Sequence, residues 1–406
     1  MKDRIGYLTN EFPVAGQTYF WREINVLEEM GVEVDIVSTR RPAEAMSGNW
    51  TVAAKARTTY LFPPSQSLVA MTWELLRAGP GGWFRCLRSI LSAEDVSLSE
   101  RARLLPLVFI GAELSYLARS RGWTHLQVHS CADAAHVALF ASLLSGLPYS
   151  LTLHGPLSNY GPNQKEKWRH AKFCIVITQQ LYEEVHRVLG AQVPDRISIA
   201  PMGVDASLFN RGRPYGAWKG DGPFRIFSCG RINPCKNHSD LITAVGILRQ
   251  RGIPAELDIA GSEDRGGAGH GEELQELSEE LGLFKAVRLL GGVPEQAIRS
   301  SLERAHVFAL VSEAEPLGVV TMEAMAMKVP VVVTRTGGVT ELVNDKIDGL
   351  LVDAARPEQV AEAIAGLASN PELCERLGQA GRERIVQHFH PKRSAQVLLD
   401  NIHESS

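Results

Sequence analysis

The stretch HVFALVSEAEPLGVVTMEAMAMKVPVVVT, residues 306–334, decides the fold. Its two ends, 306–310 and 331–334, are short runs rich in apolar and β-branched residues, which is the composition of buried strands. Between them, the residues after Gly318 are expected to open a helix. A strand, a helix and a second strand in succession predict a parallel sheet, because parallel strands need a long crossover connection.

The same alternation of strands and helices runs through most of the 406 residues. It forms two series, one in each half of the chain. We therefore predict an α/β protein with two Rossmann-like domains, each a doubly wound parallel sheet, and a ligand in the cleft at the carboxyl ends of the strands. The strands are expected at 5–8, 32–38, 126–129, 149–153 and 173–177, and then at 224–228, 256–260, 287–290, 306–310, 331–334 and 350–352.

The expected domain boundaries follow from composition and length, since a chain of 406 residues suits two domains. The N-terminal domain is expected at 1–210, with a mostly helical insertion over about 40–122. The Gly- and Pro-rich segment RGRPYGAWKGDGP, 211–223, predicts the linker. The C-terminal domain is expected at 224–388, and a last helix within 389–406 is expected to pack back toward the N-terminal domain.

Charge and cysteine content exclude several classes of protein. The net charge of −4 argues against a nucleic-acid partner, which would require clustered Lys and Arg. The six cysteines are scattered, as expected for reduced thiols in a cytoplasmic protein. The first residues, MKDRIGYLTNEF, contain no apolar signal segment, and the apolar stretch 104–118 is too short to span a bilayer.

Two carboxylates, Glu315 and Glu323, bracket seven residues around the expected start of the helix. A helix N-terminus offers free N–H groups and suits a phosphate, and Gly318 lets a ligand approach the backbone. Glu323 falls in the second helical turn among apolar neighbours, where a carboxylate is costly unless it has a partner such as paired sugar hydroxyls. The alternatives are a solvated surface acid for Glu323 and an exposed loop acid for Glu315.

Two cations follow the strand at 224–228 in the segment GRINPCKN, 230–237. Arg231 and Lys236 would lie at the carboxyl end of that strand, where a departing pyrophosphate would need neutralisation. Surface Arg and Lys are common, so the pair gains its weight from occurring in the same predicted domain as the two glutamates.

These segments resemble the retaining GT-B glycosyltransferases of the group 1, or family 4, type, which carry an E-x7-E motif. The resemblance covers the predicted C-terminal domain, including ELDIAG at 256–261 and TGGVTELVNDKIDGLLV at 336–352. One position departs from the pattern, because Lys328 stands where the family usually has Gly before the PVV strand.

The resemblance implies a role for each matching residue. Arg231 and Lys236 would bind the donor diphosphate, Glu323 the ribose hydroxyls, and Glu315 the donor sugar. The turn whose amides meet the phosphates or the sugar would be Gly318, Val319 and Val320.

The N-terminal half is similar to bacterial exopolysaccharide glycosyltransferases at two places. The segment NEFPVAGQTYFWRE, 10–23, matches their first loop and helix and implies that Gly16 contacts the donor. The strand end SLTLHG, 150–155, places His154 as the active-site histidine beside the donor sugar, although Pro156 begins the stretch where an acidic residue often follows. From the residues alone, His154 could equally be a strand-end imidazole bonded to backbone. His129 and Asp133 are further cleft candidates, with core or capping roles as the simpler interpretation.

The function implied is retaining transfer of a hexose-type sugar from a nucleoside diphosphate sugar, UDP favoured and GDP next, to an acceptor hydroxyl. The acceptor would be a sugar or a lipid-linked saccharide in bacterial polysaccharide or glycoconjugate synthesis. No cofactor or metal is expected, because the sequence has no Asp-x-Asp pair to hold a divalent ion. A nucleotide-sugar 2-epimerase of the same fold and a catalytically inactive sugar-nucleotide binder remain alternatives.

A cytoplasmic location follows, either free or peripheral at the inner face of the cell membrane. The cluster Trp83, Phe84, Arg85, Leu87 and Arg88 bears on this choice. It fits a plain amphipathic helix, which is the simpler interpretation, or a surface that touches a membrane.

Overall fold

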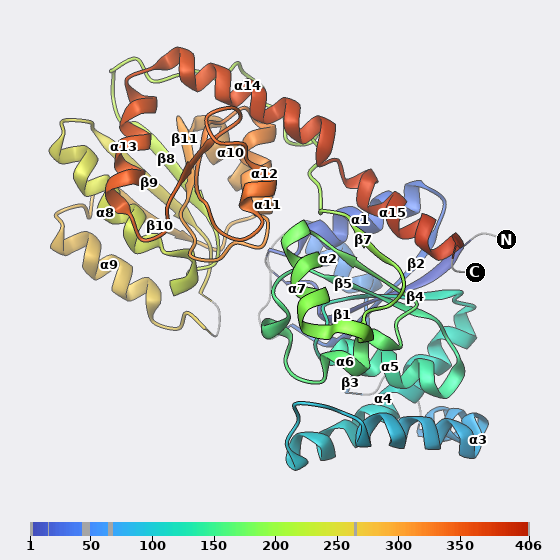
Figure 1. Ribbon diagram of the computed structural model, residues 1–406. Helices are drawn as coiled ribbons and strands as arrows, with labels where there is room; N and C mark the ends of the chain where they lie inside the picture. Colours follow the sequence, from blue (N-terminus) through green and yellow to red (C-terminus); the bar gives the residue numbers. More distant parts are fainter. Residues whose placement is uncertain (1–2, 15, 43–48, 64–67, 264–265, 405–406) are drawn as a thin grey trace. The chain divides into compact units, whose positions relative to one another are not determined.

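The computed structural model describes residues 3–14, 16–42, 49–63, 68–263 and 266–404 (Figure 1). The chain folds as two compact units. The first contains residues up to Pro201 together with the segment from Lys392 onward, and the second contains Met202–Pro391. Each unit is built around its own parallel sheet, which confirms the predicted α/β class with two Rossmann-like domains.

The first unit has a seven-stranded sheet in the order β3-β2-β1-β4-β5-β6-β7, and its neighbouring strands pair in parallel. The central strands β4 and β5 are buried at every residue, as expected for a sheet covered by helices on both faces. The strands are β1 (Arg4–Glu11), β2 (Glu33–Arg40), β3 (Thr59–Phe62), β4 (His125–His129), β5 (Tyr149–Leu153), β6 (Phe173–Val176) and β7 (Ile197–Ile199). The helices are α1 (Thr18–Glu29), α2 (Asn49–Arg57), α3 (Leu68–Leu91), α4 (Leu98–Arg121), α5 (Asp133–Ser145), α6 (Gln164–Arg169), α7 (Gln179–Leu189) and α15 (Pro391–Glu404).

The second unit has a six-stranded sheet in the order β10-β9-β8-β11-β12-β13, again parallel. Strands β11 and β12 are buried throughout, so the two ends of the stretch 306–334 form neighbouring interior strands of this sheet. The strands are β8 (Phe224–Cys229), β9 (Ala255–Ala260), β10 (Val287–Gly291), β11 (Val307–Leu310), β12 (Val331–Thr334) and β13 (Leu350–Val352). The helices are α8 (His238–Gln250), α9 (His270–Glu280), α10 (Glu295–Arg304), α11 (Val319–Ala326), α12 (Val339–Leu342), α13 (Pro357–Ala368) and α14 (Pro371–His388).

The segment 40–122 contains the expected helices α2, α3 and α4, but it also contains a strand that the sequence analysis missed. Strand β3 pairs with β2 and forms one edge of the first sheet. Strand β7, at the opposite edge, was missed as well. Both have only three or four residues, too few for an alternating pattern to be recognised in the sequence.

The segment 211–223, expected as a linker, lies within the second unit. Its aromatic residues explain the difference. The Tyr215 hydroxyl donates a hydrogen bond of 2.6 Å to the backbone oxygen of His306, and the Trp218 ring packs edge-on against Phe224. The chain therefore crosses between the units at residues 201–202, about ten residues before the expected linker.

Helix α15 packs on the first unit, although the chain reaches it from the second. Asn401 donates a hydrogen bond of 3.0 Å to the hydroxyl of Ser198, and Arg196 pairs with Glu404 at 2.5 Å. Among the described residues, no helix is both long enough and apolar enough to cross a membrane.

Lys328 occupies a backbone conformation that favours glycine. It follows α11 with a φ of 56°, in the left-handed region, where a side chain costs roughly 1–2 kcal/mol. The chain accepts this conformation because the Lys328 N–H donates to the oxygen of Met325 at 2.9 Å and closes the helix end.

We expect Lys328→Gly to stabilise the second unit by up to about 1 kcal/mol, since relief of the left-handed strain exceeds the added freedom of the unfolded chain. The midpoint of urea unfolding measures this change. Lys328→Ala is the matched control, because it removes the side chain but retains the strained Cβ, and it should give no gain. An equal gain in both variants would show that the lysine side chain, not the backbone, causes the strain.

Candidate functional site

Two loops leave the same edge of the six-stranded sheet. Strands β8 and β11 are parallel neighbours, with Ile226 paired to Val307, so their carboxyl ends lie side by side. The loops that follow are tied together by a hydrogen bond of 2.9 Å from the Glu313 N–H to the Cys235 oxygen. This edge is where ligands bind in open α/β sheets.

Lys236 and Glu315 meet between these loops. The Lys236 Nζ lies 2.5 Å from the Glu315 Oε2, and the two side chains are 12% and 10% exposed. The Ser312 hydroxyl donates to the same carboxylate oxygen at 3.3 Å. An ion pair this buried is poor evidence for stability, because removing two charges from water is costly. The structure thus joins two residues that the sequence analysis selected separately.

Helix α11 begins directly behind this pair. Gly318 is its N-cap, with a φ of 91° that a residue with a side chain rarely adopts. Val319 and Val320 are the first two helical residues, whose N–H groups lack partners inside a helix. The Thr321 hydroxyl is buried and has no hydrogen-bond partner in the described part of the chain. These donors suit an anion at the start of α11.

Glu323 is buried in α11, as the motif predicted, and is 5% exposed. The position of Glu323 can be inferred from its electrostatic effect on the thiol of Cys229, the last residue of β8. Burial and then the Glu323 carboxylate raise the pKa of Cys229, the Lys236 ammonium opposes the rise, and the resulting pKa is about 12. Glu323 and Lys236 therefore both lie close to the end of β8. The solvated-surface interpretation of Glu323 is wrong, because the helix turns this residue inward.

Arg231 lies on the same loop as Lys236 but is exposed. Its backbone oxygen lies 3.3 Å from the Nε2 of His238, the first residue of α8. The structure thus anchors the main chain of this loop and leaves the Arg231 side chain at the surface.

A third loop, after β12, packs against the backbone of Glu315. Gly338 donates a hydrogen bond of 3.1 Å to the Glu315 oxygen. A Cβ at Gly337 would lie 2.1 Å from that oxygen, so only glycine fits there. The TGG part of the motif at 336–338 therefore fixes where Glu315 lies.

The first unit places His154 directly after β5, at the carboxyl edge of its own sheet. Its Nε2 lies 2.9 Å from the Nδ1 of His129, the last residue of β4. The His129 Nε2 lies 3.2 Å from the Glu23 carboxylate, which also accepts a hydrogen bond of 2.8 Å from the Tyr7 hydroxyl. The interpretation of His154 as an imidazole bonded to backbone is wrong, because its hydrogen bond goes to a second histidine.

The other candidates in this unit lie at the surface. Gly16 is exposed in a turn with a φ of 78°, just before α1. Asp133 is exposed at the start of α5, 3.4 Å from the Arg40 guanidinium. The sequence analysis did not select Glu23, although its position within the first loop-and-helix motif was a signal.

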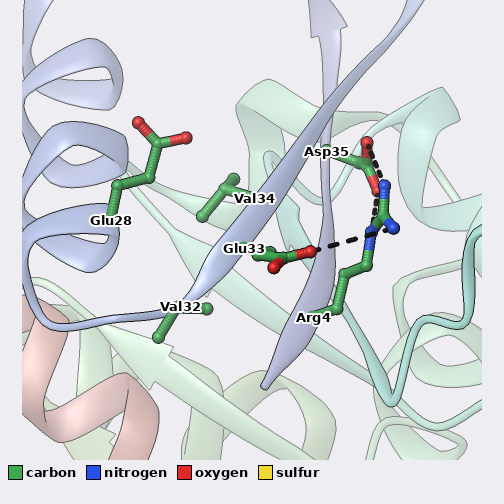
Figure 2. A pocket seen from close by; sticks show the side chains of 6 residues that line it. All are labelled: Arg4, Glu28, Val32, Glu33, Val34 and Asp35. Carbon is green, nitrogen blue, oxygen red and sulfur yellow. Dashed lines mark hydrogen bonds and ion pairs between the residues drawn. The ribbon is translucent and has the colours of Figure 1, made fainter. Parts of the chain in front are cut away.

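A hollow of about 330 Å³ lies at the opposite, amino-terminal edge of the first sheet (Figure 2). It is lined by Arg4 and residues 32–35, where β1 and β2 begin, and by Glu28 of α1. Arg4 crosses it to pair with Asp35 at 2.8 Å, and Asp35 also accepts a hydrogen bond of 2.7 Å from the Trp123 ring. These groups satisfy one another, so we assign the hollow a structural role.

Comparison with known proteins agrees with this geometry. A family model described as glycosyl transferases group 1 matches residues 218–384. The alpha-maltose-1-phosphate synthase of Mycolicibacterium smegmatis is 30% identical over 342 residues, which cover 72% of this chain and 82% of that protein. The D-inositol 3-phosphate glycosyltransferase of Saccharomonospora viridis is 29% identical over 307 residues, covering 73% of this chain and 68% of that protein.

Solved structures show the same fold. The sucrose-phosphate synthase of Thermosynechococcus elongatus superposes with a TM-score of 0.74 at 18% identity, covering 99% of this chain and 98% of that one. HepE of Anabaena, in complex with UDP and glucose, gives a TM-score of 0.76 at 18% identity and covers 99% of this chain and all of that one. The motif loops lie at one sheet edge, and a relative matches this chain over most of its own length. The chain therefore belongs to the group 1 glycosyltransferases and has their GT-B fold.

Proposed function

We propose that this chain transfers a hexose-type sugar from a nucleoside diphosphate sugar to an acceptor hydroxyl with retention of anomeric configuration. The observation that carries the proposal is the meeting of Lys236, Glu315, Glu323 and the start of α11 at the carboxyl edge of the second sheet. This edge presents cations and free amides to a diphosphate, and carboxylates to hydroxyl groups.

Each group has a distinct part in the proposed reaction. Lys236, Arg231 and the amides of Val319 and Val320 stabilise the negative charge that develops on the leaving diphosphate. Glu323 accepts hydrogen bonds from the ribose hydroxyls. Glu315, held by Lys236 and by the loop at 336–338, contacts the donor sugar.

The proposal includes retention and independence of metal ions. We propose that the acceptor attacks from the face that the leaving group vacates, and that the departing phosphate takes the acceptor proton. Lys236 and the start of α11 supply the charge stabilisation that a divalent ion would otherwise supply. Activity should therefore persist in EDTA.

UDP is the favoured nucleotide, with GDP next. HepE of Anabaena, which has the same fold, binds UDP and glucose, and this supports the choice of UDP. A thermal-shift screen against UDP-, GDP-, ADP- and dTDP-sugars identifies the donor, because a ligand at one hundred times its dissociation constant adds about 2.7 kcal/mol of stability. The acceptor is proposed to be a sugar or lipid-linked saccharide of bacterial polysaccharide or glycoconjugate synthesis.

We expect Lys236→Ala and Arg231→Ala each to lower turnover by on the order of 100-fold or more, because each removes a preorganised cation from a developing charge. The rate of product formation with the donor found in the screen measures this. Lys219→Ala and Arg213→Ala are matched controls, since both side chains are exposed on the segment 211–223.

Anomeric proton signals in NMR spectra complete this test. An α-linked donor should yield an α-linked product, and donor without acceptor should remain unchanged. Conversion of the donor sugar in the absence of acceptor would instead support a 2-epimerase. Donor binding without turnover across a panel of acceptors would support an inactive binding protein.

We also propose that the outer face of α3 rests on the cytoplasmic surface of the cell membrane, where a lipid-linked acceptor would lie. Helices α3 and α4 lie against α5 on the outside of their unit (Figure 1). Helix α3 is broken at Gly79, where the backbone is not helical, and so consists of two helical parts. We define the α3 face by the apolar side chains of both parts that are at least half exposed, together with the exposed Arg77 and Arg88. The apolar members are Leu68, Val69, Trp73, Leu76, Phe84, Leu87 and Leu91.

We expect the protein to sediment with vesicles that contain phosphatidylglycerol and not with vesicles of phosphatidylcholine alone. Arg77→Ala with Arg88→Ala should weaken binding about 30-fold at low salt, because each basic residue contributes about 1 kcal/mol at an anionic surface. Phe84→Ser with Leu87→Ser should weaken binding to all vesicles. Leu281→Ser with Phe284→Ser, exposed apolar residues of the second unit, are the control. Equal sedimentation of every variant would contradict the proposal.

A further inference from the structure

Four side chains form a continuous hydrogen-bonded chain at the carboxyl edge of the first sheet. Tyr7 lies on β1, Glu23 on α1, His129 at the end of β4 and His154 just beyond β5. Strands β1, β4 and β5 are neighbours in the sheet, so these groups are brought together by the topology. Tyr7, Glu23 and His129 are all at most 5% exposed, whereas His154 is partly exposed.

The carboxylate determines which nitrogens carry hydrogen. Burial raises the pKa of Glu23, but the interactions with His129 and the hydrogen bonds from Tyr7 and Ser394 outweigh burial, so this pKa is lowered. An ionised carboxylate only accepts hydrogen bonds, so His129 must carry a hydrogen on Nε2, which faces Glu23. When this is the single ring hydrogen of His129, its Nδ1 is an acceptor, and the hydrogen between the two rings belongs to the Nε2 of His154.

One competing donor faces the same His129 nitrogen. The amide nitrogen of Gln127 lies 3.4 Å from the His129 Nε2, but it makes a shorter hydrogen bond of 2.6 Å to the Thr152 hydroxyl. Glu23 is nearer, at 3.2 Å, and carries a charge. If the Nε2 of His129 carried no hydrogen, this nitrogen and the Glu23 carboxylate would be two acceptors in contact, which is unfavourable.

The other nitrogen of His154 is then a fixed acceptor. Burial holds the pKa of His154 well below its ordinary value, so the ring stays neutral. Its position is set by aromatic neighbours, with the ring centres of Tyr19 and Phe20 at 5.5 and 5.2 Å. Its Nδ1 has no hydrogen bond to any of the described residues, so it can accept one from a ligand.

We infer that Glu23 and a neutral His129 are positioning residues that lock His154 as the tautomer with hydrogen on Nε2, so that its bare Nδ1 accepts a hydrogen bond from a substrate hydroxyl. The identity of the hydroxyl as part of a sugar substrate rests on the proposed function. The tautomer itself does not, because the free protein already contains every group that sets it.

Nitrogen-15 NMR of the imidazole rings in the full chain without ligand tests the tautomer directly. The His154 signals, assigned by their loss in His154→Gln, should show hydrogen on Nε2 and none on Nδ1. In His129→Phe, which retains an aromatic ring against Tyr7 but removes both nitrogens, His154 should become a mixture of tautomers. His125→Phe, the same change two residues earlier on β4, should leave the His154 signals unchanged. Hydrogen on the Nδ1 of His154 in the natural sequence would overturn the inference.

The rate of sugar transfer tests whether the tautomer is used. His129→Phe should lower kcat about tenfold, the equivalent of one hydrogen bond, with little change in the KM of the donor. His129→Asn should recover most of this loss, because its Oδ1 can accept from the His154 Nε2 as the Nδ1 of His129 does. His125→Phe should be unaffected.

The two experiments separate the two ideas. The expected tautomer in a protein that transfers no sugar would support the positioning of His154 by Glu23 and His129 and contradict the proposed function. Normal kcat in His129→Phe, with His154 shown to be a mixture of tautomers, would overturn the use of this tautomer in sugar transfer while leaving the proposed function intact. If His129→Phe does not fold, His129→Asn and the spectrum of the natural sequence still decide between these outcomes.

Discussion

The ion pair between Lys236 and Glu315 is the interaction on which the candidate site depends. Two side chains nearly removed from water can remain charged only if each finds its partner at short range. Their 2.5 Å separation requires that the loops after β8 and β11 leave the same sheet edge. The parallel pairing of these strands provides that arrangement, and the hydrogen bond from Gly338 to Glu315 secures the loop backbone. A donor diphosphate would bind next to a cation that is already in position.

The first unit uses the same topological constraint with a different chemistry. Its neighbouring strands β1, β4 and β5 deliver Tyr7, His129 and His154 to one edge, and α1 adds Glu23. Here most of the groups are buried, and only the last imidazole is accessible. We infer that the Glu23 carboxylate sets the hydrogen position on His154 without contacting it. Each hydrogen bond in the series from Glu23 through His129 to His154 determines the direction of the next.

The sequence predicted the parts of the structure whose causes are local. The E-x7-E spacing placed Gly318 before a helix and Glu323 inside it, and short Val-rich runs marked the central strands. The sequence did not predict the contact between Glu23 and His129, because these residues lie far apart in the chain and only strand order brings them together. The linker expected at 211–223 differs from the structure for a similar reason. Its Gly and Pro residues are visible in the sequence, but the packing of Tyr215 is not.

The hydrogen bonds from Glu23 through His129 to His154 also bear on Pro156, where the sequence departs from the family pattern. The resemblance implies an acid just after the histidine, and this chain has Pro156 there, so the ring of His154 lacks that constraint on its tautomer. The carboxylate of Glu23 restores the missing constraint from the opposite side of the ring, through His129. An acid placed behind the histidine leaves the outward side clear of negative charge. In the proposed reaction that side receives a sugar attached to a diphosphate, so an orienting carboxylate interferes least when it lies inside the sheet edge.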